Sequence, residues 1–370
     1  MKVLLAAGGS AGHIEPALNL ADTLRSDDPQ VDVVAVGRED GLEARLIPAR
    51  GYRLRTVPAV PLPRRPSRDL LLVPGRVSAS ARAMAAVMAE EGPDVVVGFG
   101  GYVALPAYLA ARRRRIPLVI HEANARAGLA NRVGARLTPW VAEAVPGALP
   151  RATHVGMPLR AAIREVAAHG RQARRDEARA VFGLDADRPT LLVFGGSLGA
   201  QRLNASVSAA AEDLTAAGVQ VLHAVGERAA GMPEGGLRVR EHGEPPYITV
   251  PYIDRMDLAY SAADLAVTRA GAMTCAELAA VALPAVYVPL PVGNGEQRLN
   301  AQPLVEAGGG ILVEDAEFDG RAVQSIVLPV ITHPGRLAAM TDAASGHAVT
   351  DGDQRLAALV RAAAAMGQRP

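Results

Sequence analysis

Short runs of Val, Leu and Ile alternate along the chain with longer segments rich in Ala and Arg. Within each run the apolar residues are consecutive, which is typical of strands buried on both faces of a parallel sheet. The runs lie at 3–7, 31–36, 94–98 and 117–120, and again at 190–194, 219–224, 248–253, 265–268 and 285–290. Alternation of such strands with segments of helical length predicts α/β architecture with parallel sheets.

One stretch of this pattern occurs twice. LLAAGGSAG at 4–12 is echoed by LLVFGGSLG at 191–199, and each copy is a buried run followed by a glycine turn. The repeat predicts two Rossmann-like domains in tandem, with a cleft between the carboxyl ends of their strands. Gly156 and Pro158 punctuate the pattern, so we expect domains at 1–157 and 158–345. The last helix, at about 346–370, fits either domain.

Composition narrows the classes of function. A length of 370 residues suits two domains, and a net charge of +1 disfavours a nucleic-acid partner. Lys2 is the only lysine, so neither a Walker A loop nor a pyridoxal-phosphate Schiff base can form. Cys275 is the only cysteine, which excludes a disulfide framework. The apolar start of the chain ends at Gly8, too early for a signal peptide, so we expect a cytoplasmic protein.

Three glycine turns follow predicted strands, at 8–9, 98–101 and 195–196. Glycine lets the backbone approach a ligand closely, and the helix that follows presents free N–H groups to a phosphate. The turns therefore predict a phosphate or diphosphate site. The Gly-x-Gly-x-x-Gly fingerprint does not occur, which disfavours a nicotinamide or flavin enzyme.

Three motifs imitate metal sites, and we assign none of them to a metal. Asp185 and Asp187 precede a strand, at the wrong end of a sheet for a ligand cleft. Asp351 and Asp353 are typical of a turn and a helix N-cap. The segment HEANA at 121–125 has alanine where a zincin motif needs its second histidine.

Six short motifs follow one another along the chain. They are GGSAGH at 8–13, GGY at 100–102, HEAN at 121–124, GGS at 195–197, RAGAMT at 269–274 with Glu277, and GEQRLN at 295–300. In this order and spacing they resemble the MurG family, the N-acetylglucosaminyltransferases that convert lipid I into lipid II. The resemblance implies a GT-B fold, in which two Rossmann-like domains face a cleft and the final helix packs back on the first domain.

The resemblance also implies which residues bind the nucleoside of a UDP-N-acetylglucosamine donor. The backbone of Ile253 is expected to contact the uracil. Glu277 is expected to bind the ribose hydroxyls, which suits a carboxylate beside a cis-diol. The turn at a helix start that cradles ribose and diphosphate is formed by Ala272, Met273, Thr274, Cys275 and Ala276.

Other residues are implied to hold the phosphates and the sugar. Ser197 and Arg160 contact phosphate, Gln297 contacts the sugar and diphosphate region, and Asn124 contacts the transferred sugar. A helix N-terminus suits a diphosphate leaving group, whose negative charge grows in the transition state. No cofactor and no metal are expected.

The first glycine turn is implied to face the acceptor and the reacting centre. Ser10, Ala11 and Gly12 are counted with the donor-binding residues there, and His13 is the candidate general base. The alternative for His13 is that it caps the helix or only contacts diphosphate. Many family members have glycine at the position of Ala11, and Ala11 limits positive φ at that turn.

The implied reaction is an inverting transfer of N-acetylglucosamine to the muramyl C4 hydroxyl of undecaprenyl-diphosphate-linked muramyl-pentapeptide, lipid I. Such an enzyme serves peptidoglycan synthesis, and through it cell shape and division. Its lipid acceptor implies peripheral contact with an anionic membrane on the cytoplasmic face. The segment 62–76 joins arginines to an apolar run, as interfacial segments do. The run Arg112–Arg115 is expected to face water at a helix C-terminus.

Three alternatives remain open at this point. A UDP-N-acetylglucosamine 2-epimerase shares the two-domain fold, but it needs no lipid and no second substrate. A GT-B transferase with another lipid or a natural-product acceptor would use the same donor half. A degenerate binding protein is disfavoured because Glu277, Gln297, Asn124 and His13 are all present.

Overall fold

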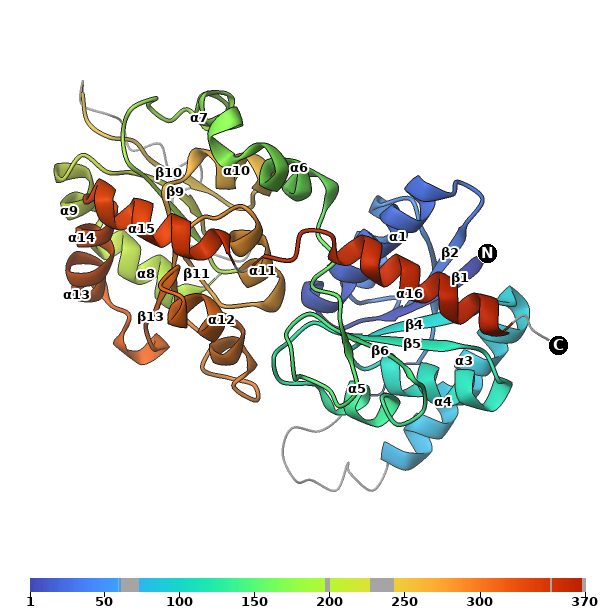
Figure 1. Cartoon of the computed structure of the whole chain (residues 1–370). Helices are drawn as coiled ribbons and strands as arrows, with labels where there is room; N and C mark the ends of the chain where they lie inside the picture. Colours follow the sequence, from blue (N-terminus) through green and yellow to red (C-terminus); the bar gives the residue numbers. More distant parts are fainter. Residues whose placement is uncertain (59, 61–72, 197–199, 227–242, 347, 368–370) are drawn as a thin grey trace. The chain divides into compact units, whose positions relative to one another are not determined.

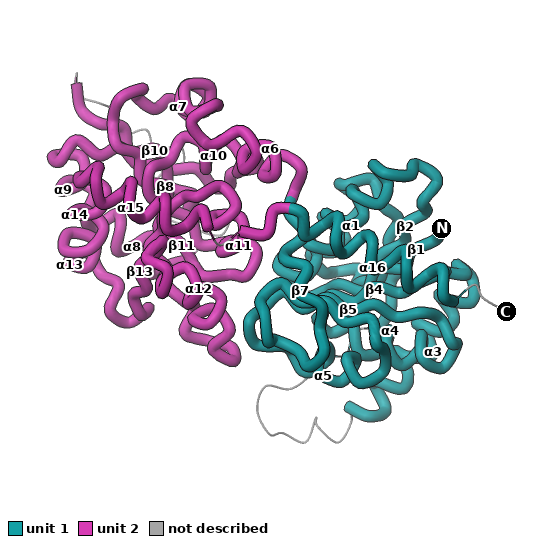
Figure 2. Tube along the Cα trace, viewed as in Figure 1, with its two compact units in different colours: residues 1–159, 351–370 teal, residues 160–350 magenta. Residues whose placement is uncertain are grey.

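The structure, a computed structural model, describes residues 1–370 except 59, 61–72, 197–199, 227–242, 347 and 368–370. The chain divides into two units (Figure 2). Unit 1 comprises residues 1–159 and 351–370, and unit 2 comprises residues 160–350. The predicted boundary, between residues 157 and 158, lies two residues before this division, and the last helix belongs to unit 1.

Unit 1 is built on a seven-stranded parallel sheet (Figure 1). The strand order is β3-β2-β1-β4-β5-β6-β7, and β1 pairs with β2 and β4 in the centre. The strands are β1 (Lys2–Ala7), β2 (Asp32–Gly37), β3 (Arg53–Thr56), β4 (Val95–Gly100), β5 (Leu118–Glu122), β6 (Trp140–Glu143) and β7 (Thr153–His154).

Helices cover both faces of this sheet, and the side chains of β1 show why. Val3 and Leu5 point to one face, where they pack with α1 and α16, while Leu4 and Ala6 point to the other, where they pack with α3 and α4. All four residues are at most 1% exposed, which explains the unbroken apolar runs of the sequence. The helices are α1 (Ala11–Asp27), α2 (Glu43–Ala49), α3 (Val73–Glu91), α4 (Ala104–Arg114), α5 (Leu129–Gly134) and α16 (Gly352–Gly367).

Unit 2 repeats the same topology. Its six-stranded parallel sheet has the order β10-β9-β8-β11-β12-β13, so β8 holds the central place that β1 holds in unit 1. The strands are β8 (Thr190–Phe194), β9 (Gln220–Ala224), β10 (Tyr247–Val250), β11 (Leu265–Thr268), β12 (Ala285–Tyr287) and β13 (Gly310–Leu312). The two copies of the repeated segment are therefore β1 and β8 with the turns that follow them.

The helical segments of unit 2 connect these strands. They are α6 (Ala161–His169), η2 (Arg171–Arg174), α7 (Arg175–Phe182), α8 (Gln201–Ala209), α9 (Ala211–Ala216), α10 (Met256–Ala262), α11 (Ala272–Ala280), α12 (Glu296–Glu306), η3 (Asp315–Glu317), α13 (Gly320–Ala322), η4 (Val323–Val327), α14 (Leu328–Ile331) and α15 (Pro334–Ser345). Among the residues that the structure describes, no helix is both long and apolar enough to cross a membrane.

Candidate active site

The first glycine turn joins β1 to α1 and ends in a helix N-terminus. Gly9 has φ +90°, Ser10 is the N-cap residue with φ −152°, and Ala11 is the first helical residue. The left-handed conformation therefore falls on Gly9, where no Cβ opposes it. Ala11 and Gly12 have helical geometry, so the alanine fits this turn without strain.

His13 lies in the first turn of α1, against two neighbouring groups. Its Nδ1 is 2.9 Å from the hydroxyl of Ser10. A Cβ atom on Gly100 would lie 2.9 Å from its Nε2 and Cδ2, so the ring packs against the turn after β4. Burial lowers the pKa of His13, and the negative charge of Glu43 opposes that shift. The imidazole is consequently neutral at neutral pH, the form that accepts a proton.

The turn after β4 packs directly on the turn after β1. Gly100 and Gly101 have φ of +100° and +81°. A Cβ on Gly101 would lie 1.9 Å from the carbonyl oxygen of Gly8, which only glycine avoids. The predicted glycine turn at 98–101 thus meets the one at 8–9 backbone to backbone, as expected of adjacent parallel strands whose carboxyl ends share one edge of the sheet.

The loop after β5 is organised by Glu122, a residue 2% exposed. Its Oε1 accepts hydrogen bonds from the backbone and side-chain nitrogens of Asn124, at 2.9 and 3.3 Å. Its Oε2 accepts from Gly128 N and Asn131 Nδ2, at 3.1 and 2.9 Å. Burial raises the pKa of Glu122 and these donors oppose the rise. Glu122 and Asn131 therefore position the predicted sugar contact Asn124.

In unit 2 the predicted ribose carboxylate is fixed by two side chains. Glu277 lies on α11 and is 2% exposed. Arg160 donates from Nε and Nη2 to its Oε1, at 3.2 and 2.9 Å. The hydroxyl of Tyr260, on α10, donates to its Oε2 at 2.8 Å. The structure thus brings two predicted donor residues, Arg160 and Glu277, into contact and adds Tyr260, which the sequence motifs had not indicated.

The other predicted donor residues follow strands of the same sheet. Ile253 comes after β10, and Gln297 comes after β12 and accepts from Leu290 N at 2.9 Å. At the start of α11, Ala272, Met273, Thr274 and Ala276 are partly exposed, whereas Cys275 is buried. Burial raises the pKa of the Cys275 thiol, which makes it a poor nucleophile. Ser197, after β8, lies outside the described residues.

No cluster of three or more His, Cys, Asp or Glu side chains in the described part of the chain is arranged to hold a metal ion. The acidic motifs serve protein contacts instead. Asp185 pairs with Arg188 at 2.7 Å, and Asp351 with Arg355 at 2.9 Å. Asp353 accepts a hydrogen bond from the hydroxyl of Thr23, at 2.7 Å.

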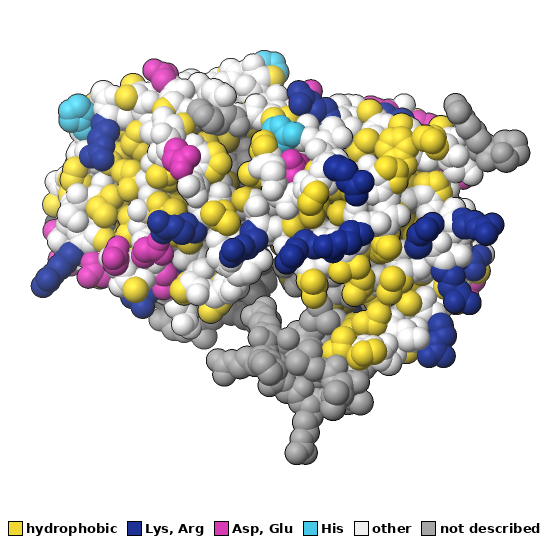
Figure 3. All heavy atoms as spheres, turned by 60° about the horizontal axis from the view of Figure 1, so that its bottom comes forward, with side chains coloured by type: hydrophobic (Ala, Val, Ile, Leu, Met, Phe, Trp, Pro, Cys, Tyr) yellow, Lys and Arg dark blue, Asp and Glu magenta, His cyan; other side chains and the backbone are white. Residues whose placement is uncertain are grey.

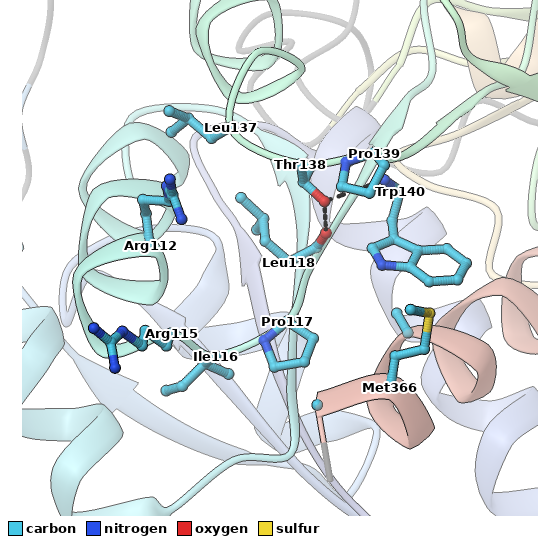
Figure 4. Close-up of a pocket in the computed structure, with 12 residues that line it drawn as sticks. Arg112, Arg115, Ile116, Pro117, Leu118, Leu137, Thr138, Pro139, Trp140 and Met366 are labelled. Carbon is cyan, nitrogen blue, oxygen red and sulfur yellow. Dashed lines mark hydrogen bonds between the residues drawn. The ribbon is translucent and has the colours of Figure 1, made fainter. Parts of the chain in front are cut away.

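A separate pocket of about 270 Å³ lies at the amino ends of β5 and β6, the opposite edge of the sheet from the glycine turns (Figure 4). Arg112 and Arg115 border it, beside apolar side chains that include Ile116, Trp140 and Met366. Arg115 has φ +57°, a conformation that favours glycine at a helix end. Two arginines of the run 112–115 therefore line an apolar pocket.

Comparison with known proteins identifies the family. Residues 3–143 match the glycosyltransferase family 28 N-terminal domain, and residues 190–356 match the C-terminal domain of that family. The UDP-N-acetylglucosamine–N-acetylmuramyl-(pentapeptide) pyrophosphoryl-undecaprenol N-acetylglucosamine transferase of Acidothermus cellulolyticus is 58% identical, over 99% of this chain and 98% of that protein.

Solved structures agree at the level of the fold. Acinetobacter baumannii MurG has a TM-score of 0.75 at 27% identity, covering 98% of this chain and 99% of that one. A putative UDP-N-acetylglucosamine 2-epimerase from Listeria monocytogenes has a TM-score of 0.67, covering 100% of this chain and 98% of that one. Its identity is only 14%, so this second likeness shows the fold alone.

The two glycosyltransferase family 28 domains, built on tandem parallel sheets of matching strand order, define a glycosyltransferase of the GT-B fold. The relatives that match over the full length specify which one. The chain belongs to the MurG family, the UDP-N-acetylglucosamine–N-acetylmuramyl-(pentapeptide) pyrophosphoryl-undecaprenol N-acetylglucosamine transferases. The predicted fold class and family are confirmed.

Proposed function

We propose that this chain transfers N-acetylglucosamine from UDP-N-acetylglucosamine to lipid I, forming lipid II for peptidoglycan. The observation that carries the proposal is the 58% identity, over 99% of the chain, to a transferase with that name. The epimerase alternative rests on a likeness of fold at 14% identity, which carries no activity. The residues beside the glycine turns, at the carboxyl edges of the two sheets, also suit a sugar transfer.

The donor is bound by unit 2 in this proposal. Parallel strands place the residues after β8, β10, β11 and β12 at one edge of the sheet, where a nucleotide binds in doubly wound folds. Ile253 contacts the uracil and Glu277 the ribose, while Arg160 and Ser197 contact phosphate. Gln297 reaches the sugar and diphosphate region. The free N–H groups at the start of α11 stabilise the diphosphate as it leaves.

The acceptor hydroxyl is activated by His13 of unit 1. Its Nε2 takes the proton while the hydroxyl oxygen attacks the anomeric carbon of N-acetylglucosamine. The bond from that carbon to UDP breaks, its electron pair leaves with UDP, and the configuration inverts. The contact between Nδ1 and the Ser10 hydroxyl supports this role, because it orients the ring. Asn124 holds the transferred sugar.

We also propose that the protein binds peripherally to an anionic membrane surface on the cytoplasmic face, where its acceptor is anchored. Most of the segment expected to do so, 62–76, lies outside the described residues, including Arg64, Arg65 and Arg68. The arginine-bordered pocket of unit 1 supports the proposal. It combines cationic and apolar side chains, as interfacial sites do.

The deciding experiment supplies UDP-N-acetylglucosamine with and without a lipid I analogue. We expect a lipid-linked disaccharide and one UDP released per disaccharide, and no change in the sugar nucleotide when the acceptor is omitted. Conversion of the sugar nucleotide alone would establish an epimerase. Transfer to diacylglycerol in place of lipid I would establish the other transferase class.

A further inference from the structure

A buried carboxylate joins three strand ends in unit 1. The strands β2, β1 and β4 are neighbours, and Glu43 follows β2 as the first residue of α2. Its Oε1 accepts from the backbone N–H of Gly9, after β1, and from the hydroxyl of Tyr102, after β4, each at 2.6 Å. Glu43 is 0% exposed. One oxygen atom therefore ties together the two turns between which His13 is packed.

Glycines around Glu43 leave only enough room for its side chain. A Cβ on Gly37 would lie 2.7 Å from the Cβ and Cγ of Glu43, and one on Gly41 would lie 1.9 Å from its Oε2. A Cβ on Gly8 would lie 2.6 Å from its Oε1. Three glycines from two loops thus form a slot that any larger residue would close.

The second oxygen of Glu43 is not accounted for by structural needs. Among the described residues, Oε2 is buried and has no hydrogen-bond partner. Burying an unpaired carboxylate oxygen is costly. A carboxylate oxygen kept buried without a partner indicates a role for Glu43 beyond joining the two turns.

The charged and titratable groups around Glu43 show what that charge acts on. His13 lies on α1, and the negative charge of Glu43 acts to raise its pKa. Tyr102 faces it from the turn after β4, with the guanidinium of Arg38 5.8 Å from the centre of the Tyr102 ring. Arg38 is itself paired with Asp40. His13 is therefore a group whose protonated form Glu43 stabilises.

We propose that Glu43 is a positioning residue for the transfer, fixing the Gly9–Ser10 turn and stabilising the imidazolium that forms when His13 takes the acceptor proton. The proposal rests on His13 as the base of the proposed function. Glu43 acts through its electric field, since Nδ1 of His13 already contacts Ser10. Without this charge His13 would be a weaker base and the transition state would lose stabilisation.

The test replaces Glu43 by glutamine. The amide oxygen can still accept the hydrogen bonds from Gly9 and Tyr102, and the negative charge is removed. We expect E43Q to lower kcat with the lipid I analogue about 10-fold, a fraction of what general-base catalysis contributes. The acid limb of the kcat profile should move to lower pH, because removing the negative charge of Glu43 lowers the pKa of His13 further. The KM for UDP-N-acetylglucosamine should change much less than kcat, since most of the donor residues belong to unit 2.

A matched control is Glu143, another buried carboxylate at the same sheet edge. It accepts from Gly147 N and Leu149 N, at 2.8 and 2.9 Å, in the loop after β6. Glu143→Gln should lower the melting temperature and leave the acid limb in place. If E43Q does not fold, E43D and Y102F take its place: both keep the charge, so both should keep the wild-type acid limb while kcat falls.

Three results would overturn the proposal: a wild-type kcat and acid limb in E43Q, a displaced limb in E43D or Y102F, or an equal displacement in Glu143→Gln. Measuring E43Q in a His13→Ala background distinguishes failure of the Glu43 proposal from failure of the assignment of His13 as the base. E43Q should cost little more in that background, because its effect passes through His13. A His13→Ala enzyme with wild-type kcat would reject the base assignment, and a wild-type enzyme without transfer would reject the proposed function.

Discussion

Glu277 is a nearly buried carboxylate whose position is determined by side chains distant in the sequence. Arg160 lies 117 residues before it and Tyr260 lies 17 residues before it. A carboxylate held at both oxygens keeps one orientation, so little conformational entropy is lost when a ligand binds to it. The contacts therefore suit a residue that receives the ribose diol of the donor.

For Glu277→Ala we expect donor binding about 10- to 100-fold weaker, because each charge-assisted hydrogen bond to the ribose contributes roughly 1.5 to 3 kcal/mol. The loss should appear in the KM for the donor more than in kcat, since the contact holds ground and transition states alike. The measurement compares UDP-N-acetylglucosamine with its 2′-deoxy and 3′-deoxy analogues on both proteins.

The same comparison distinguishes ribose binding from a structural role of Glu277. A deoxy donor should lose much of its affinity for the wild type but little further for Glu277→Ala. Tyr260→Phe serves as the control, because it keeps the carboxylate and removes one of its partners. It should raise the donor KM only a few-fold. Additive losses in Glu277→Ala would show that Glu277 does not touch the ribose.

The motifs of the sequence indicated residues one short segment at a time, most of them just after a predicted strand. They did not indicate Glu43, Tyr102 or Tyr260 as partners, although Tyr102 stands next to the GGY glycines. Glu43 reaches Gly9 across 34 residues and Tyr102 across 59. Such contacts depend on which strands become neighbours, and local spacing carries no information about that.

Strands with a continuous apolar run were predictable, whereas short strands and strands with polar residues were not, including the buried strand β6 with the sequence WVAE. β8 and β11 have the predicted bounds. β10 was predicted at 248–253 but ends at Val250, because Pro251 has no N–H to continue the ladder. β3, with the sequence RLRT, and the two-residue β7 lie at the sheet edge, where one side remains unpaired and no apolar run is needed.

Helix α16 completes the core of unit 1 from the far end of the chain. Leu356, Ala357 and Val360 are 0% exposed and pack in the same cluster as α1 and the central strands. For Leu356→Ala we expect a loss of about 2 to 5 kcal/mol in the free energy of unfolding of unit 1. Hydrogen exchange followed by mass spectrometry resolves the two units and should show faster exchange in β1, β4 and β5 but not in β8 to β13.

The control for this prediction lies on the same helix. Met366 is 59% exposed, so Met366→Ala should leave exchange in both units almost unchanged. Equal acceleration in the two units after Leu356→Ala would show that they unfold together. The helix would then stabilise the whole chain rather than unit 1.

The whole chain is almost neutral, with 39 basic and 38 acidic residues, so affinity for an anionic surface has to come from local arrangement. In the view of Figure 3, basic and hydrophobic side chains lie together on unit 1 with few acidic ones among them. The pocket bordered by Arg112 and Arg115 has the same mixed character. An interfacial site of this kind is weakened by salt, whereas a purely apolar one is not.

We therefore expect the full chain to bind reversibly to vesicles of phosphatidylglycerol and phosphatidylcholine, as measured by sedimentation. Binding should fall clearly in 0.5 M salt, because the screening length there is roughly fivefold shorter than at 0.02 M. Because a surface arginine contributes about 1 kcal/mol near an anionic bilayer, Arg112→Glu with Arg115→Glu should weaken binding at least about 10-fold. Polar residues in place of Leu70, Leu71 and Leu72 should weaken it further.

The control is Arg321→Glu with Arg336→Glu, at exposed positions of unit 2. This pair changes the net charge equally and should have little effect. Equal weakening by the two arginine pairs would mean that only net charge matters, and would remove the pocket from the interface.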